Sequence, residues 1–133
     1  MRAASAVSNL QRILIVEDNH DSALSLKMLL EVLGHEVDVV HDGEAAVSLA
    51  ADRQPEVVLM DIGLPRMNGY EAARRIRSDC QGRSLVIVAL TGWGQQEDRR
   101  KSADAGIDHH LVKPLDLEKL MQILGRGQAS ASA

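Results

Sequence analysis

The chain alternates between short apolar runs and longer stretches in which apolar residues recur every three or four positions. Five runs have the length and composition of β-strands, at residues 12–17, 36–40, 56–60, 84–90 and 107–112. Helical stripes lie between and after them: Ala23, Leu26, Leu30 and Leu33, then Gly69, Ala72, Ala73 and Ile76, and last Leu117, Leu120, Met121 and Leu124. Residues 95–105 are mostly polar and give the weakest helical pattern. Strict alternation of strands and helices predicts an α/β fold with a parallel sheet covered by helices on both faces.

The composition of the strands predicts their order in the sheet. Residues 13–16, 57–60 and 85–90 are continuously apolar, as strands covered on both faces must be. The second strand carries Asp38 and the fifth carries the polar residues 108–110, so these two suit the edges. With right-handed crossovers, we expect a doubly wound five-stranded parallel sheet of order 2-1-3-4-5, a flavodoxin-like fold. Ligands of such sheets bind at the carboxyl ends of the strands, beside the switch point between strands one and three.

The ends of the chain are small and polar. We expect one domain over residues 12–124, a flexible N-terminal segment at 1–11 and a flexible C-terminal tail at 125–133. Within the domain, Gly34 and Gly106 each follow a helical stretch at the position where a left-handed helix cap is wanted.

Polar residues with chemical potential stand where the predicted strands end. Strand one ends at Glu17 and Asp18, strand three at Asp61, strand four at Thr91 and strand five at Lys113. Each residue alone reads most simply as a solvated loop position. Because the carboxyl ends of parallel strands share one edge of the sheet, the five together predict a single site.

The chemistry of this set favours a divalent cation and a phosphoryl group. Three carboxylates in one cleft repel one another, and hard oxygen ligands with room for water suit Mg²⁺ better than zinc; calcium would want more ligands. Lys113 supplies a fixed positive charge and Thr91 a hydroxyl donor. Phosphoryl transfer needs mainly an aligned nucleophile and cations on the equatorial oxygens. We therefore expect Asp61 to be the nucleophile and Glu17 and Asp18 to hold the metal.

Four segments carry a family resemblance. They read "ILIVED" at 13–18, "LMDIGLPRMNGYE" at 59–71, "ALTGWG" at 89–94 and "LVKPL" at 111–115. Together with the intervals of 43, 30 and 22 residues that separate Asp18, Asp61, Thr91 and Lys113, they make the chain resemble the receiver domain of a two-component response regulator. The segments "TGWGQ" and "DHHLVKP" are also similar to receivers attached to hybrid sensor kinases.

The resemblance implies a phosphoacceptor and a metal site. Asp61 would accept a phosphoryl group from a phosphohistidine of a sensor histidine kinase or a phosphotransfer domain. Mg²⁺ would be bound by Asp18, Asp61 and the backbone carbonyl of Gly63, and through a water molecule by Glu17. The domain would promote its own phosphorylation and dephosphorylation, so no enzyme with a separate turnover substrate is expected.

The resemblance also implies a response to phosphorylation. Lys113 would pair with the phosphate, and Thr91 would move toward it to report its presence. The family often has an aromatic switch residue three positions before the lysine, where this chain has His110, and a Phe after Lys-Pro, where it has Leu115. The bulky Trp93, two residues beyond Thr91, is expected to flank the phosphate pocket.

Composition limits the compartment and the partners. The net charge of −4 argues against a nucleic-acid footprint, and the densest basic cluster, Arg74, Arg75 and Arg77, reads as the solvated face of a helix. The apolar runs are far too short for a membrane span. The single Cys80 fits a reducing compartment, so a cytoplasmic protein is expected. The family resemblance implies that it is a bacterial signalling protein. No output domain follows residue 124, so the chain reads as a stand-alone receiver, a phosphorelay intermediate or a piece of a larger protein with an unknown downstream partner.

Other functions that share this fold fit less well. An aspartate-nucleophile phosphatase places a second acid two residues after the nucleophile, where this chain has Gly63. A flavodoxin-like carrier or a dinucleotide-binding domain needs a phosphate-cradling loop after strand one, where Glu17 and Asp18 would repel a phosphate. A receiver-like adaptor that no longer accepts phosphate remains the strongest non-chemical alternative.

The five histidines suggest no separate metal site. His109 and His110 are adjacent on a strand and therefore point to opposite faces. His20, His35 and His41 have no ligand spacing, and surface or edge positions are expected for them.

Overall fold

The computed structural model describes residues 11–64, 67–80, 84–92 and 99–132 of the chain. The strands are β1 Arg12–Val16, β2 Glu36–Val40, β3 Val57–Asp61, β4 Val86–Thr91 and β5 His109–Val112. The helices are α2 His20–Val32, α3 Gly43–Arg53, α4 Gly69–Asp79, α5 Arg99–Ala105 and α6 Leu117–Ser132.

The five strands form one parallel sheet of order β2-β1-β3-β4-β5. In its register, Ile13 of β1 lies opposite Val37 of β2 and Val57 of β3, and Asp61 at the end of β3 lies opposite Leu90 of β4. The fold class, the strand order and the two edge strands predicted from the sequence are thereby confirmed.

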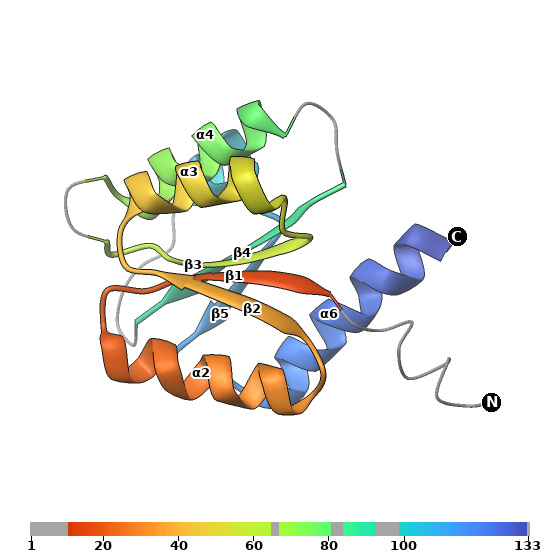
Figure 1. Ribbon diagram of the computed structural model, residues 1–133. Coiled ribbons are helices and arrows are strands. Elements are labelled where there is room, and N and C mark those ends of the chain that lie inside the picture. Colours follow the sequence, from red (N-terminus) through yellow and green to blue (C-terminus); the bar gives the residue numbers. More distant parts are fainter. Residues whose placement is uncertain (1–10, 65–66, 81–83, 93–98, 133) are drawn as a thin grey trace.

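Helices cover both faces of the sheet (Figure 1). In that view, α3 and α4 lie above the strands, whereas α2 and α6 lie below them. Successive residues of β1 alternate between the two layers: Leu14 and Val16 pack with α3 and α4, and Ile13 and Ile15 pack with α2 and α6. Because no face of the central strands meets water, their sequences are apolar at every position, and polar groups are left to the strand ends.

Short polar side chains and glycines set the helix boundaries. Asn19, Asp42 and Asn68 each cap a helix by accepting a hydrogen bond from the backbone N–H three residues further on, at 2.8 to 3.0 Å. Gly34 and Gly106 have φ angles of 100° and 80°, so both left-handed positions predicted from the sequence are confirmed.

The ends of the domain differ from the expectation in two places. Helix α6 continues to Ser132, although the apolar stripe ends at Leu124. No proline stands between Leu124 and Ser132 to break the backbone hydrogen-bond pattern of the helix. At the other end, Gln11 is buried rather than part of a frayed segment; residues 1–10 lie outside the described residues.

The expectation of a solvated basic cluster is confirmed for Arg74 and Arg75, which are exposed, but Arg77 is half-buried. Its guanidinium donates to the carbonyl of Leu85 at 2.7 Å, to the carbonyl of Gly106 at 2.6 Å and to the Asp108 carboxylate at 2.8 Å. The same Asp108 oxygen accepts the backbone N–H of Ile87 at 2.8 Å. Arg77 therefore fastens α4 to the beginnings of β4 and β5, a set of contacts between distant segments that helical periodicity does not reveal.

Gly69 allows α4 to begin directly against the end of β3. A Cβ atom at this position would lie 2.7 Å from the carbonyl oxygen of Asp61 and 2.8 Å from the Cα of Ile62. The Gly69 N–H also donates to the carbonyl of Ile62 at 3.1 Å. Because the obstructing atoms belong to the backbone, no side chain can be fitted without moving the strand end.

We expect Gly69→Ala to lower the free energy of unfolding by about 1–3 kcal/mol, the usual range for overpacking. Gly125→Ala in α6 is the matched control, since a Cβ there meets nothing within 4 Å. Loss of a helical glycine should raise the free energy of unfolding at position 125 by up to about 1 kcal/mol. Urea denaturation of both variants measures the difference, and equal effects would contradict the steric argument.

His35 is held in its neutral form at the start of the sheet. Its Nδ1 accepts a hydrogen bond from the backbone N–H of Gln11 at 3.1 Å, so this nitrogen carries no proton. Burial lowers the pKa of His35 below its usual value of 6.5. The unfolded chain therefore takes up this proton more readily than the folded protein does.

The contribution of His35 to stability should be complete above pH 6.5 and should decline as the pH falls through the lowered folded-state pKa. His35→Asn keeps an acceptor for Gln11 but cannot titrate, so the variant should lose less stability than wild type between pH 7.5 and pH 5. Urea denaturation across this range is the measurement, with His109→Asn as the control. Parallel pH profiles for wild type and His35→Asn would exclude this role.

Candidate functional site

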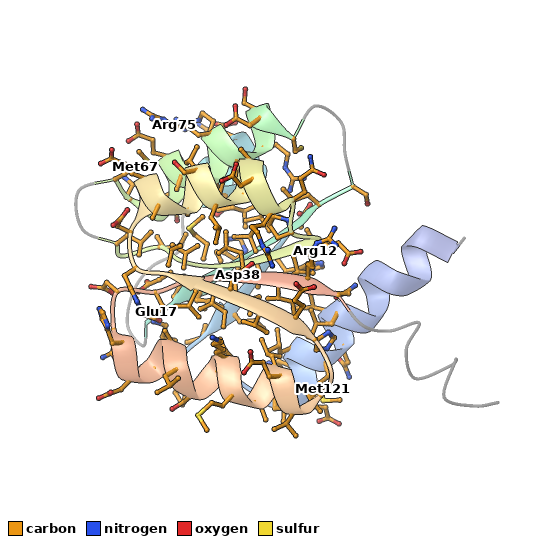
Figure 2. The ribbon with its side chains drawn as sticks, viewed as in Figure 1. Arg12, Glu17, Asp38, Met67, Arg75 and Met121 are labelled. Carbon is orange, nitrogen blue, oxygen red and sulfur yellow. The ribbon has the colours of Figure 1, made fainter. Side chains whose placement is uncertain are left out.

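The carboxyl ends of three strands bring together a cluster of charged side chains. Glu17 and Asp18 follow β1, Asp61 ends β3 and Lys113 follows β5. One oxygen from each of the three carboxylates lies within 4.8 Å of the others. Figure 2 shows Glu17 at the end of β1 nearest the start of α2, with Arg12 at the opposite end of the strand. We call these four side chains the acidic cleft.

Asp61 is held from two sides. The residue is 8% exposed, its Oδ1 accepts the backbone N–H of Gly63 at 2.9 Å, and its Oδ2 lies 3.4 Å from Nζ of Lys113. The turn after β3 thus fixes the orientation of the carboxylate. The remaining lone pairs of both oxygens are available to a ligand.

Lys113 is the positive charge of the acidic cleft. Its Nζ donates to Oε1 of Glu17 at 2.5 Å as well as to Asp61. Burial by itself lowers the pKa of Lys113, but the bonds and charges of Glu17 and Asp61 outweigh burial and raise the pKa above its usual value. Lys113 is therefore a cation at neutral pH.

The ionised form of Glu17 is disfavoured by its surroundings. Burial raises the pKa of its carboxyl, and repulsion from Asp61 adds to this; the bond from Lys113 opposes the shift but does not cancel it. Three carboxylates against one ammonium therefore form a site in which a further cation would be stabilised.

Thr91 lies at the same edge, but its hydroxyl is bonded elsewhere. The residue is 2% exposed, and its Oγ1 donates to the carbonyl of Leu111 on β5 at 3.4 Å. Its own carbonyl accepts the backbone N–H of Lys113 at 2.7 Å. Thr91 and Lys113 are thus linked through the backbone at the ends of β4 and β5.

The two remaining sequence-predicted residues have different outcomes. Nε2 of His110 lies 2.6 Å from the hydroxyl of Ser102 on α5, so the ring joins the edge strand to its neighbouring helix. Trp93, predicted to flank the phosphate pocket, lies outside the described residues.

Sequence reasoning missed a pair of histidines beside the cleft. The rings of His20 and His41 stack with their centroids 3.7 Å apart and 9° between their planes, and Nδ1 of His41 lies 3.0 Å from the carbonyl oxygen of Glu17. Neither has ligand spacing, so both were expected to be ordinary surface positions. The signal lies in the strand register: Val16 pairs with Val40, so the residues that follow them become neighbours.

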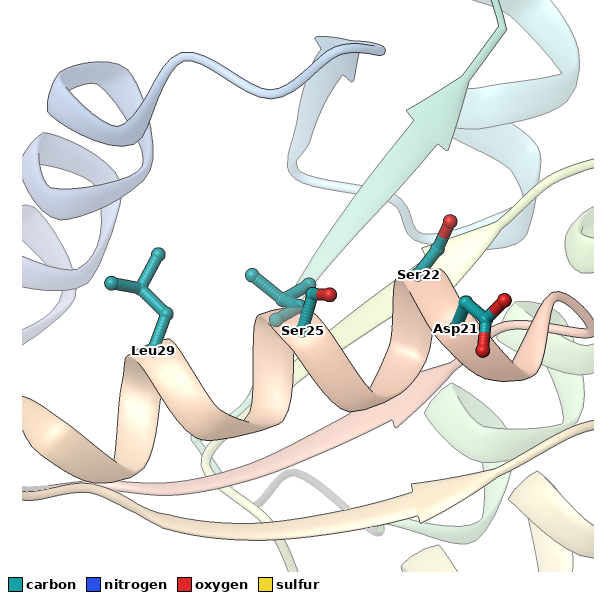
Figure 3. Close-up of a pocket in the computed structure, with 5 residues that line it drawn as sticks. Asp21, Ser22, Ser25 and Leu29 are labelled. Carbon is teal, nitrogen blue, oxygen red and sulfur yellow. The ribbon is translucent and has the colours of Figure 1, made fainter.

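A shallow hollow on α2 lies apart from the acidic cleft (Figure 3). Its lining comes from this one helix: Asp21, Ser22, Ser25, Leu26 and Leu29. A surface formed by a single helix cannot enclose a ligand, and the chemistry remains at the strand ends.

The chain is similar to known proteins over most of its length. Residues 13–125 match the model of the response regulator receiver domain. The chain is 34% identical to protein PilH of Pseudomonas aeruginosa, over 85% of this chain and 93% of PilH. It is 32% identical to the DNA-binding dual master transcriptional regulator RpaA of Synechocystis, over 83% of this chain and 46% of RpaA. The chain thus spans about half the length of RpaA but nearly all of PilH.

Solved structures of receiver domains have the same fold as this chain. The receiver domain of the sensor histidine kinase PA1611 from Pseudomonas aeruginosa, with a magnesium ion coordinated in its active site cleft, has a TM-score of 0.79 at 39% identity, over 90% of this chain and 98% of that domain. The receiver domain of Ssk1 from Saccharomyces cerevisiae, crystallised with the histidine phosphotransfer protein Ypd1, has a TM-score of 0.81 at 27% identity, over 92% and 91% of the two chains.

The described part of the chain contains no helix long and apolar enough to cross a bilayer. A parallel sheet of order 2-1-3-4-5, three carboxylates and a lysine at its carboxyl edge, and a family match over residues 13–125 agree with one another. The chain belongs to the response regulator receiver domains of two-component signalling.

Proposed function

We propose that this receiver domain accepts a phosphoryl group on Asp61 from a phosphohistidine, with Mg²⁺ bound in the acidic cleft. The observation that carries the proposal is the convergence of Glu17, Asp18 and Asp61 with Lys113 at one edge of the sheet. The donor is a sensor histidine kinase or a phosphotransfer domain. The co-crystal of Ssk1 with Ypd1 supports a partner of this type.

The donor set of the cleft fits Mg²⁺. Asp18 and Asp61 would be the direct carboxylate ligands, the backbone carbonyl of Gly63 would be a third, and Glu17 would act through a water molecule. Carboxylate and carbonyl oxygens in small number, with room for water, suit this ion. The three carboxylates face the single ammonium of Lys113, which supports an added positive charge in the cleft. When bound, the ion neutralises charge on the transferring phosphoryl oxygens.

Transfer requires Asp61 to be ionised and aligned. A bond forms between a carboxylate oxygen of Asp61 and phosphorus as the phosphorus–nitrogen bond of the donor breaks, and the electron pair of that bond stays on the imidazole. The N–H of Gly63 orients the acceptor, since it holds Oδ1 at 2.9 Å. Lys113, a cation 3.4 Å from Oδ2, is placed to pair with the phosphoryl oxygens.

The phosphate is reported through the ends of β4 and β5. The Thr91 hydroxyl makes a long bond of 3.4 Å to Leu111, which it can exchange for a phosphoryl oxygen. His110, bonded to Ser102, connects this movement to α5, and Trp93 modulates the phosphate's lifetime. The phosphorylated form is recognised by a downstream protein rather than by nucleic acid or a membrane. The domain acts in the cytoplasm and turns over no separate substrate.

Incubation with acetyl phosphate and Mg²⁺ should add one phosphate to the wild-type protein, and Asp61→Asn should abolish the addition because the amide is not a nucleophile. Intact-protein mass spectrometry measures the product. Asp52→Asn, an exposed acid of α3 outside the cleft, is the control and should be phosphorylated normally. Persistent phosphorylation of Asp61→Asn would place the acceptor at another residue.

Asp18→Asn should weaken Mg²⁺ binding by about tenfold or more, judged by what loss of a metal-site contact usually costs. It should also raise the free energy of unfolding in EDTA, since it removes one of three mutually repelling carboxylates. Calorimetric Mg²⁺ titration and urea denaturation measure the two effects. Asp21→Asn, in the first turn of α2, should change Mg²⁺ affinity little. Unchanged Mg²⁺ affinity in Asp18→Asn would show that the metal does not bind at this cluster.

A further inference from the structure

The loop between β1 and α2 supplies two of the three carboxylates but restrains them unequally. Glu17 is tied at every polar group: its N–H donates to the carbonyl of Val40 at 3.1 Å, its Oε1 accepts from Lys113 and its Oε2 accepts from the N–H of Asn19 at 3.2 Å. Asp18, by contrast, is exposed. The backbone that carries Asp18 sets the point from which its side chain starts.

The peptide that leads into Asp18 is held by His41. Nδ1 of His41 lies 3.0 Å from the carbonyl oxygen of Glu17. A carbonyl can only accept, so Nδ1 carries the proton and donates it. The carbonyl of Glu17 and the N–H of Asp18 belong to one planar peptide unit. Fixing the carbonyl therefore fixes the plane from which the Asp18 side chain departs.

A second ring holds His41 in place. His20, the first residue of α2, stacks on His41 with the centroids 3.7 Å apart and the planes within 9°. Its neighbour Asn19 caps the same helix by accepting the N–H of Ser22 at 2.9 Å. The loop is thus restrained on one side by the Glu17 carbonyl and on the other by the start of α2, and both restraints meet at the ring of His41.

We propose that His41, steadied by His20, is a positioning residue for the metal: it fixes the Glu17–Asp18 peptide so that the Asp18 carboxylate faces the other two acids. This inference rests on the proposed function, because it concerns the Mg²⁺ site. It gives the edge strand β2, which contributes no side chain to the acidic cleft, control over metal affinity. The pairing of Val16 with Val40 is what brings His41 beside Glu17.

Three variants separate the hydrogen bond from the stacked ring. His41→Ala removes both, His20→Ala removes the stack alone, and His41→Asn keeps a donor, since the amide nitrogen of Asn is attached to Cγ as Nδ1 of histidine is. We expect His41→Ala to weaken Mg²⁺ binding by about tenfold, His20→Ala by less, and His41→Asn to recover most of the affinity. Dissociation constants are obtained from amide shifts in an NMR titration with MgCl₂.

The rate of phosphorylation by acetyl phosphate gives a second readout. In His41→Ala the rate should be low at limiting Mg²⁺ and return near the wild-type value at saturating Mg²⁺, because the phosphoryl acceptor itself is untouched. A role in folding alone would not produce this split. His109→Ala, which removes a half-buried imidazole from the opposite edge strand, should leave Mg²⁺ affinity unchanged.

Each outcome has a separate meaning. If wild type binds Mg²⁺ and both His41→Ala and His20→Ala bind it equally well, the positioning role is wrong while the proposed function stands. If His41→Ala does not fold, the comparison of His41→Asn with His20→Ala decides, and wild-type affinity in both overturns the inference. If wild type shows no Mg²⁺ response, the metal site and the inference are both wrong.

Discussion

The three carboxylates of the acidic cleft repel one another. Among the described residues of the cleft, the ammonium of Lys113 is the positive charge that opposes this repulsion. It reaches Glu17 and Asp61 at once, from a strand on the far side of β3 and β4. The ends of β1, β3 and β5 are therefore held together by electrostatics that a hydrophobic core cannot supply. The balance is incomplete, because three carboxylates face one ammonium. An incompletely balanced cleft attracts cations, and this property connects the fold to its chemistry.

The carboxylates gather at one edge because the two faces of the sheet are covered by helices and exclude charged groups. Helices on both faces bury Ile13 and Leu14 alike, so β1 can carry charge only where it ends. Parallel pairing then places all such ends at the same edge. Gly69 completes the arrangement, because it allows α4 to start against the backbone of Asp61 without a side chain in between.

The sequence alone sufficed for the strand order and for the meeting of Glu17, Asp18, Asp61 and Lys113 at one edge of the sheet. Continuous apolar runs mark strands covered on both faces, and each strand's last polar residue is adjacent to its run, so local patterns carry the information. The role of Arg77 and the stacking of His20 on His41 could not be read in this way. Those contacts join segments that are far apart in the chain and depend on register and side-chain direction. Helical periodicity could not show where α6 ends either, since its last residues extend the helix without an apolar stripe.

The contacts of Arg77 have a mechanical consequence. They fasten the beginnings of β4 and β5 to α4 through Leu85, Gly106 and Asp108. Thr91 and Lys113 stand at the opposite ends of these two strands. Arg77 therefore restrains the beginnings of β4 and β5, while Lys113 and the backbone bond from its N–H to Thr91 connect their ends at the acidic cleft. Helix α5 belongs to both sides of this arrangement, because Ser102 bonds to His110 of β5 and Ala105 packs in the same cluster as α4.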